Sequence, residues 1–438
     1  VKDVEHGVRY EPAGLGFASE YDPLTRFGMC ADFITTLQVS DTSAIAYGGM
    51  REAEHMLDVI QTDNTSESIW IWTHYYALTG SDTYHDNIDA AWYYCMNFPA
   101  YDEEGGSDLV TGYYRVYNCA WALRAEMEYR RVYGDAQYST YADSCASYLC
   151  HNPLMLHFPT GFYRKVNGLV MGWAVGNLYE YGEFVDNPIY KAKAVDMADS
   201  LKTWVEQNPN KLHWDQWAMN GGSVMWGLVH SYFKEYPADL QTWVETYAPY
   251  LDTEIDSADY QNAWRAWAAL GQSTASEVLG SGIYAAYFKH LADTLVTNDG
   301  DNDGGIPVKD DDPDDYDQSW VTNYLGLMCM DRLLATASVG DYVWDRPLQV
   351  VVTPNPSYDP PTIEFMLEEP SQVRLCFYDV LGREIIDRDL GLLSAGKQRI
   401  DLGDLTLSNR FSPGIYFYEL HSARKVAKGK VVVLMFRR

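Results

Sequence analysis

The spacing of apolar residues changes once along the chain. Between about residues 22 and 336, apolar positions recur three and four residues apart, whereas beyond residue 346 they alternate with polar positions. The first spacing predicts helices and the second predicts strands. About seven short strands follow the helices, so we expect two domains, 1–340 and 341–438. We expect about twelve helices, over residues 22–39, 64–79, 82–97, 111–134, 136–151, 168–184, 187–207, 214–235, 237–251, 256–271, 275–297 and 316–336.

The connections between the predicted helices alternate in length. Short turns at 78–84, 132–138 and 180–190 share a glycine, an acidic residue and a tyrosine that opens the next helix. They form a weak internal repeat of about 54 residues. Longer polar or glycine-rich loops precede every second helix. This alternation favours a closed double ring, in which inner and outer helices alternate and all the long loops lie at one rim.

The double ring resembles the (α/α)6 barrel of six-hairpin glycosidases and related polysaccharide lyases. The resemblance covers about three quarters of the chain and is architectural, because no motif selects one family. It implies an all-α (α/α)6 toroid in residues 1–340 and a polysaccharide or other glycan as the partner.

The period-two region predicts a C-terminal all-β, immunoglobulin-like sandwich in residues 341–438. Its motifs are PNP at 354–356, DVLGRE at 379–384, SPGIYFY at 412–418 and KVVV at 430–433. These motifs resemble the C-terminal sorting domain of type nine secretion and the immunoglobulin-like domain of flagellar hook-capping proteins. The resemblance implies a bacterial protein that the secretion machinery exports, and that is then attached to the outer-membrane surface or released. A generic immunoglobulin-like accessory module is the alternative.

The chain is strongly acidic, with a net charge of −30. Nucleic acids and anionic membrane surfaces bind basic patches, so neither is an expected partner. No stretch reaches the roughly 20 apolar residues of a membrane span. The seven cysteines are scattered without a CxxC pair, so we expect buried free thiols instead of a zinc site. The chain begins at Val1, and we expect a mature or trimmed form.

An acidic stretch, DGDNDGGIPVKD at 299–310, has the spacing of a calcium-binding loop. Acidic residues occupy its positions 1, 3, 5 and 12, glycine at position 6 allows a sharp turn, and position 7 offers a backbone carbonyl. It differs from the usual loop in ending on aspartate and in having proline at position 9. We expect a structural Ca²⁺ that holds one wall of the cleft; a solvated acidic loop is the alternative. The expected ligands are Asp299, Asp301, Asp303, Gly305 and Asp310.

The predicted inner helices begin alike, each with a tryptophan as an anchor. One helical turn nearer the rim stand Glu67, Asn118, Val170, Ser223, Gln261 and Asp317. Only Glu67 and Asp317 are acidic, and they belong to the first and last inner helices, which a closed ring makes neighbours. Glycoside hydrolysis needs two facing carboxyl groups. We therefore expect Glu67 and Asp317 to be catalytic, with Asp63 and Asp215 as alternates. Helix capping explains acidic residues in a first turn equally well.

The same rim is rich in aromatic residues, whose flat rings can stack on the faces of sugars. A large aromatic core is the alternative role for these rings. The candidate substrate-binding residues are Trp70, Tyr113, Tyr114, Trp173, Trp214, Trp217, Tyr260, Gln261 and Trp320.

These features predict a secreted, carbohydrate-active protein, with glycoside hydrolysis favoured. A lyase could use Tyr114, Arg115 and Asn118, but so acidic a chain suits a polyuronate substrate poorly. Two non-catalytic alternatives stay open. One is a surface or filament-forming protein that self-assembles, and the other is a glycan-binding protein without turnover.

Overall fold

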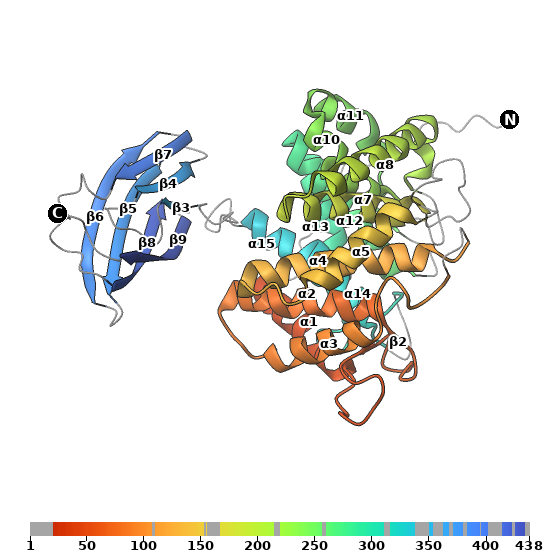
Figure 1. Cartoon of the computed structure of the whole chain (residues 1–438). Coiled ribbons are helices and arrows are strands. Elements are labelled where there is room, and N and C mark those ends of the chain that lie inside the picture. The colour runs from red at the N-terminus through yellow and green to blue at the C-terminus, as the bar shows by residue number, and fades with distance from the viewer. Residues whose placement is uncertain are drawn as a thin grey trace. The chain divides into compact units, whose positions relative to one another are not determined.

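The computed structural model describes residues 21–106, 110–152, 155, 167–213, 220–255, 260–310 and 316–337, and the segments 350–353, 362–367, 371–379, 383–394, 396–401, 414–422 and 425–433. The chain divides into two compact units, Val1–Leu334 and Ala335–Arg438, which are described separately (Figure 1).

An inner ring of helices is buried on nearly all sides. Each inner helix packs on the next and the last returns to the first, so the ring is closed. Because these helices have no solvent face, their apolar residues surround the helix instead of forming one stripe. The ring comprises α2 (Thr62–Thr79), α4 (Tyr113–Tyr133), α7 (Asn167–Phe184), α9 (Asn220–Val229), α12 (Gln261–Leu279) and α14 (Ser319–Tyr324), which continues into the π-helix η4 (Leu325–Met330).

The outer helices bury one face against this ring. They are α1 (Pro23–Leu37), α3 (His85–Asn97), α5 (Ser139–His151), α8 (Pro188–Gln207), α11 (Leu240–Tyr247) and α13 (Gly282–Thr297). Shorter elements are β1 (Met50–Arg51), β2 (Ile60–Gln61), α10 (Tyr232–Glu235), α15 (Asp331–Ala337) and the 3₁₀ turns η1 (Pro209–Lys211), η2 (Pro237–Asp239) and η3 (Ala248–Tyr250). The predicted (α/α)6 toroid is confirmed.

One predicted helix boundary is wrong for a packing reason. The sequence suggested a break just after Gly271, but α12 continues to Leu279 and ends at Gly280, whose φ is 60°. Gly271 lies against Gly222 of α9, and a Cβ atom on Gly222 would overlap the carbonyl of Trp267. The two glycines therefore allow two inner helices to approach at the level of their backbones, instead of ending a helix. The predicted helices 214–235 and 316–336 are each divided into shorter segments.

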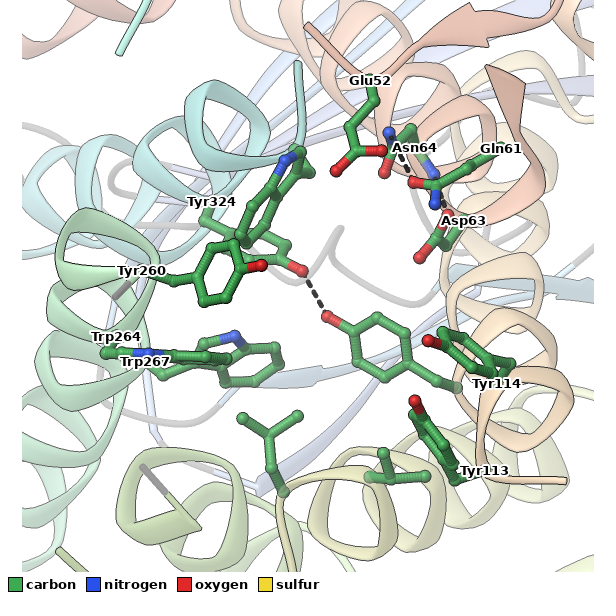
Figure 2. A pocket seen from close by; sticks show the side chains of 14 residues that line it. Glu52, Gln61, Asp63, Asn64, Tyr113, Tyr114, Tyr260, Trp264, Trp267 and Tyr324 are labelled. Carbon is green, nitrogen blue, oxygen red and sulfur yellow. Dashed lines mark hydrogen bonds between the residues drawn. The ribbon is translucent and has the colours of Figure 1, made fainter. Parts of the chain in front are cut away.

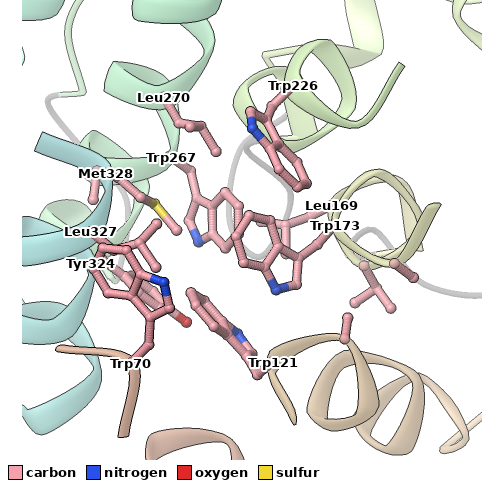
Figure 3. Packing of buried hydrophobic residues seen from close by; sticks show 14 of the residues in the cluster. Trp70, Trp121, Leu169, Trp173, Trp226, Trp267, Leu270, Tyr324, Leu327 and Met328 are labelled. Carbon is pink, nitrogen blue, oxygen red and sulfur yellow. The ribbon is translucent and has the colours of Figure 1, made fainter. Parts of the chain in front are cut away.

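Tryptophans fill the middle of the ring (Figure 3). The ring centroid of Trp173 lies 4.5 Å from that of Trp121, 4.6 Å from that of Trp226 and 5.3 Å from that of Trp267. All are essentially inaccessible to solvent. This packing closes the centre of the toroid, so that a ligand can enter only from an end.

A buried ion-pair triad joins the inner ring where it closes. Nδ1 of His74 on α2 lies 2.7 Å from Glu128 on α4, and Nε2 lies 3.0 Å from Asp331 on α15. Burial opposes the charge on the imidazole, but the two carboxylates raise the pKa of His74 to about 9. The triad thus connects the first, second and last parts of the ring.

The described strands of the C-terminal unit form two antiparallel sheets around a common core. The sheets have the orders β3–β4–β7 and β6–β5–β8–β9. Along β8, Tyr416, Tyr418 and Leu420 face the core and alternate with exposed Ile415 and Phe417, as period two requires. The strands are β3 (Val350–Thr353), β4 (Thr362–Leu367), β5 (Ser371–Asp379), β6 (Glu384–Leu393), β7 (Gly396–Asp401), β8 (Gly414–Ser422) and β9 (Lys425–Val433).

Candidate active site

A cavity of about 320 Å³ lies at the N-terminal ends of the inner helices. This is the rim at which the alternating connections placed a cleft. The lining residues come from the N-terminal parts of α2, α4, α7, α12 and α14, from β2 and from the segment between β1 and β2. They are Glu52, Gln61, Asp63, Asn64, Tyr113, Tyr114, Tyr117, Leu169, Val170, Tyr260, Trp264, Trp267, Trp320 and Tyr324.

Aromatic side chains form two opposite walls of the cavity (Figure 2). Tyr113 and Tyr114 form one wall, with their ring centroids 4.1 Å apart. Tyr260 and Trp264 form the other wall with Trp320, whose ring centroid is 5.8 Å from that of Tyr260. Two aromatic walls of this kind leave a slot in which the faces and edges of their rings can contact a ring-shaped ligand.

Polar side chains gather on a third side of the cavity (Figure 2). Glu52 lies between β1 and β2, and Asp63 lies in the first turn of α2, where its Oδ1 accepts a 2.9 Å hydrogen bond from the N–H of Asn64. Burial and the nearby charge of Glu104 raise the pKa of Asp63 well above its ordinary value. Burial and the same charge raise the pKa of Glu52. Two carboxyl groups with raised proton affinity therefore face the aromatic slot.

Glu104 stands behind Asp63, outside the residues that line the cavity. Its Oε1 accepts a hydrogen bond from the N–H of Thr62, 2.9 Å away, and its Oε2 accepts one from Nδ2 of Asn118, 3.1 Å away. Burial raises the pKa of Glu104, and these two hydrogen bonds oppose the shift. Glu104 thereby connects the first turn of α2 to α4.

The floor of the cavity carries a pair of tyrosines above Glu67. The hydroxyl groups of Tyr117 and Tyr324 are hydrogen-bonded to each other (Figure 2). Glu67 is only 1% exposed and lies within 3.4 Å of Nδ2 of Asn323. Burial and the charge of Asp63 raise the pKa of Glu67 well above its ordinary value, although hydrogen bonds from Asn323 and Tyr324 oppose the shift. Glu67 is therefore beneath the cavity, separated from it by the tyrosines.

The second acidic residue that the sequence singled out is elsewhere. Asp317 is 1% exposed and does not line the cavity. Its carboxyl group lies against Gly305 of the acidic loop, where a Cβ atom would overlap it, and its N–H donates to Oε2 of Glu54 over 3.2 Å. The ring does bring the first and last inner helices together, since Asn323 of α14 reaches Glu67 of α2. It does not place both predicted carboxyl groups in one pocket.

The remaining predicted site residues divide into four groups. Tyr113, Tyr114, Tyr260 and Trp320 line the cavity, whereas Trp70 and Trp173 are buried outside it. Gln261 is structural: its Nε2 donates to the carbonyl of Ile255 and its Oε1 accepts from the N–H of Asp310. The fourth group lies outside the described residues and comprises Trp214, Asp215 and Trp217.

The acidic loop brings three of its predicted ligands together. Asp299, Asp301 and Asp303 each offer an oxygen atom, and these atoms lie within 4.8 Å of one another. Gly304 has a φ of 105°, which suits the sharp turn expected at position 6. Asp310 instead forms a two-pronged ion pair with Arg265. The loop therefore presents a cluster of three carboxylates, and its twelfth position pairs with α12.

Sequence reasoning missed several residues that line the cavity or support it from behind. Glu52 and Glu104 belong to loops between elements, and no periodic pattern assigns a loop residue to a rim. The sequence did not single out Tyr117 or Tyr324, although each lies about one turn inside its helix. Trp264 was treated only as an anchor. Distance from a helix start could have identified some of these residues. Asp63, Tyr117 and Trp264 all lie within about one turn of the start of an inner helix.

Comparison with known proteins identifies the C-terminal unit and the fold of the helical unit. Residues 351–434 match the family described as the secretion system C-terminal sorting domain. Among curated proteins, none matches the chain in sequence. Among the described residues, no helix is both long and apolar enough to cross a membrane.

Solved structures share the architecture of the helical unit. The GH76A alpha-1,6-mannanase of Salegentibacter sp. HEL1_6 aligns over 71% of this chain and 98% of its own, with a TM-score of 0.52 and 11% identity. An unsaturated glucuronyl hydrolase specific for heparin aligns over 72% and 98%, with a TM-score of 0.50 and 12% identity. The Lin0763 protein of Listeria innocua aligns over 74% and 100%, with a TM-score of 0.51 and 10% identity. The helical unit thus shares the (α/α)6 toroid fold of these structures and is followed by a type nine secretion sorting domain, which directs the chain to the cell surface or the extracellular medium.

Proposed function

We propose that this exported protein is a glycoside hydrolase that binds its sugar in the aromatic cavity and acts with Asp63 and Glu52. One observation carries the proposal: two carboxyl groups with raised proton affinity face a slot between aromatic walls. Hydrolases and other sugar-active proteins with this fold include the mannanase and the glucuronyl hydrolase above.

The two carboxyl groups would have different roles. A glycosidic bond breaks when an acid protonates the leaving oxygen while a second carboxylate activates water or attacks the anomeric carbon. Asp63 suits the role of acid, because burial and the charge of Glu104 keep it protonated to higher pH. Glu52 is assigned the second role. The stereochemistry of the first-formed product, followed by NMR, distinguishes inversion from retention.

The structure gives less support to a lyase. The guanidinium group of Arg115 lies 3.8 Å from the carboxylate of Asp102, and the amide of Asn118 donates to Glu104. Neither side chain lines the cavity, so neither is placed to neutralise a substrate carboxylate there.

The test is hydrolysis of a polysaccharide panel, with reducing ends and unsaturated products measured separately. We expect reducing ends without unsaturation. Asp63→Asn and Glu52→Gln should each lower kcat by at least about a hundredfold while glycan binding, measured by calorimetry, persists. Asp317→Asn is the matched control, because it removes a buried carboxyl group just before α14 that does not line the cavity. Full loss of turnover in Asp317→Asn and none in Asp63→Asn would reverse the assignment.

Two other outcomes would replace the hydrolase proposal. Binding without turnover across the panel would indicate a glycan-binding protein. Concentration-dependent polymers in light scattering or electron microscopy, with no glycan binding, would indicate a structural, self-assembling protein.

We also propose that the acidic loop binds a structural Ca²⁺ through Asp299, Asp301 and Asp303, with the carbonyl of Gly305. Calcium prefers six to eight oxygen ligands, and three carboxylates already converge. Arg265 holds both oxygens of Asp310, so this residue would brace the loop instead of completing the site; Asp299 also has a cationic neighbour, Arg26, which contacts its Oδ2.

Calcium binding would affect the cavity through the chain that follows the loop. The carbonyl of Ile306 accepts a 3.0 Å hydrogen bond from the N–H of Gln318, and Trp320 of the cavity wall lies two residues further on. We expect Ca²⁺ to raise the melting temperature of the helical unit and chelation to lower it. Asp301→Asn should weaken the effect, whereas Asp41→Asn, in an exposed turn, should not. An unchanged melting temperature in millimolar Ca²⁺ would contradict the proposal.

A further inference from the structure

The hydrogen-bond donors around Glu104 differ from those around Asp63, and this difference bears on which of the two carboxyl groups is charged. Both oxygens of Glu104 accept hydrogen bonds, one from the backbone N–H of Thr62 and one from the side-chain amide of Asn118. These donors match an ionised carboxylate, which only accepts. Asp63 has one such contact, from the N–H of Asn64, and its side chain otherwise faces the cavity. When two carboxyl groups interact closely they share a proton unequally, so the donor set places the charge on Glu104.

We infer that Glu104 is a positioning residue: it holds the first turn of α2 and keeps a negative charge behind Asp63, so that Asp63 faces the cavity in its protonated form. This inference rests on the proposed function in one respect, because the retained proton is the one that Asp63 would donate to a leaving group. The position of Glu104 does not depend on the proposed function. Glu104 adopts a positive φ of 49° and is followed by Gly105, whose φ is 63°, so the loop turns sharply to bring this carboxylate inward.

Several other groups face Asp63 and could also influence it. Glu52 lies across the polar side of the cavity, and Glu67 lies one turn deeper on α2. From α4 and α14 come the neutral hydroxyls of Tyr117 and Tyr324. Glu104 differs from these groups in its hydrogen bonds. One of its carboxylate oxygens accepts from the N–H of Thr62 in α2, and the other accepts from the amide of Asn118 in α4.

Replacement of Glu104 by glutamine removes the charge and can keep both hydrogen bonds. The glutamine oxygen can accept from the N–H of Thr62. Its amide can donate to Oδ1 of Asn118, a buried atom without a partner in the native arrangement, once the Asn118 amide turns over. Glu104→Gln is therefore a change of charge with little change of shape. Glu103→Gln is the matched control, because it removes an equal charge from the adjacent residue of the same loop.

The experiment has one readout that needs no substrate. Infrared difference spectra between the native protein and Asp63→Asn follow the protonated carboxyl band of Asp63 through a pH titration. We expect this band to persist above the ordinary range of an aspartic acid and to disappear about one pH unit or more lower in Glu104→Gln. Glu103→Gln should move it much less. An Asp63 that titrates in the ordinary range in the native protein, or an unchanged midpoint in Glu104→Gln, would overturn the inference.

The second readout is the pH dependence of kcat/KM on a substrate found in the panel. The alkaline limb should move to lower pH in Glu104→Gln by the same amount as the infrared midpoint. A merely structural role predicts lower kcat or a lower melting temperature with an unmoved limb, and that result would also overturn the inference. If no substrate is hydrolysed but the infrared midpoint moves, the proposed function fails and the role of Glu104 stands. If Glu104→Gln does not fold, the titration of Asp63 in the native protein still decides the matter.

Discussion

The strongest quantitative prediction concerns the triad that closes the inner ring at the end away from the cavity. Glu128→Gln would remove one of the two carboxylates that flank His74, while its amide oxygen could still accept the 2.7 Å hydrogen bond from the imidazole. The side chains of His74 and Glu128 are 3% and 10% exposed, so solvent screens their attraction little.

The magnitude follows from the proton affinity of Glu128. Burial alone would raise its pKa, but the charges of His74 and Arg131 lower it from 4.5 to about 2. A difference of about 2.5 units at 1.36 kcal/mol per unit is about 3 kcal/mol of stability. The raised pKa of His74 reflects the same contact and is not added to this value.

The directions of the two pKa shifts determine the pH range in which the triad stabilises the folded state. Glu128 has a depressed pKa, so its contribution is complete above pH 4.5 and is lost as pH falls toward 2. His74 has a raised pKa, so its charge is lost as pH rises through about 9. We therefore expect Glu128→Gln to lower the free energy of unfolding by about 3 kcal/mol at pH 6 and by about 1 kcal/mol at pH 3.

Urea unfolding followed by tryptophan fluorescence reports mainly on the helical unit, because every tryptophan except Trp344 lies within Val1–Leu334. Glu183→Gln, an exposed glutamate on α7 near the same end of the ring, is the matched control and should change stability by less than about 0.5 kcal/mol. A loss below about 1 kcal/mol at pH 6, or one that does not depend on pH, would refute the account of the triad.

Three further predictions concern the floor, the helix packing and the wall of the cavity. Glu67→Gln should raise the melting temperature at pH 8 but not at pH 4. Burial raises the pKa of Glu67, so the folded state loses stability when this group ionises at higher pH. The same change in melting temperature at both pH values would contradict this. Gly222→Ala should lower the free energy of unfolding by about 2 kcal/mol or more, since its Cβ atom would overlap the backbone of α12. Gly282→Ala, whose Cβ atom would meet open space, should leave the free energy measured by chemical denaturation unchanged. Trp320→Ala should weaken glycan binding roughly tenfold, about 1.4 kcal/mol in calorimetry, and Tyr250→Ala, an exposed ring away from the cavity, should leave it unchanged.

Local patterns predicted most of the architecture for simple reasons. Apolar spacing depends on the period of the backbone, so helices and strands could be located, and the switch of period near residue 340 separated the two units. Alternating loop lengths implied which helix ends share a rim, because a closed ring of hairpins leaves little other choice. The sorting-domain motifs were specific enough to indicate export. Boundaries failed where a residue had two uses, as at Gly271, which can end a helix or let two helices touch.

The candidate site shows where local patterns stop. Asp63 and Glu67 are four residues apart on one face of α2, and sequence spacing treats them alike. Packing separates them, because Tyr117 and Tyr324 meet above Glu67 and leave Asp63 facing the cavity. Glu104 reaches the same place from a loop.

The sequence by itself determined the two domains, the helical ring, the export signal and the rim that carries aromatic and acidic residues, since these depend on periodicity, loop length and short motifs. Only the tertiary structure decided which carboxyl groups face the cavity, which lies buried beneath it and which supports it from behind. The physical reason is that a carboxyl group's exposure and proton affinity depend on neighbours distant in sequence, such as Asn118 and Tyr324, and no local pattern records them.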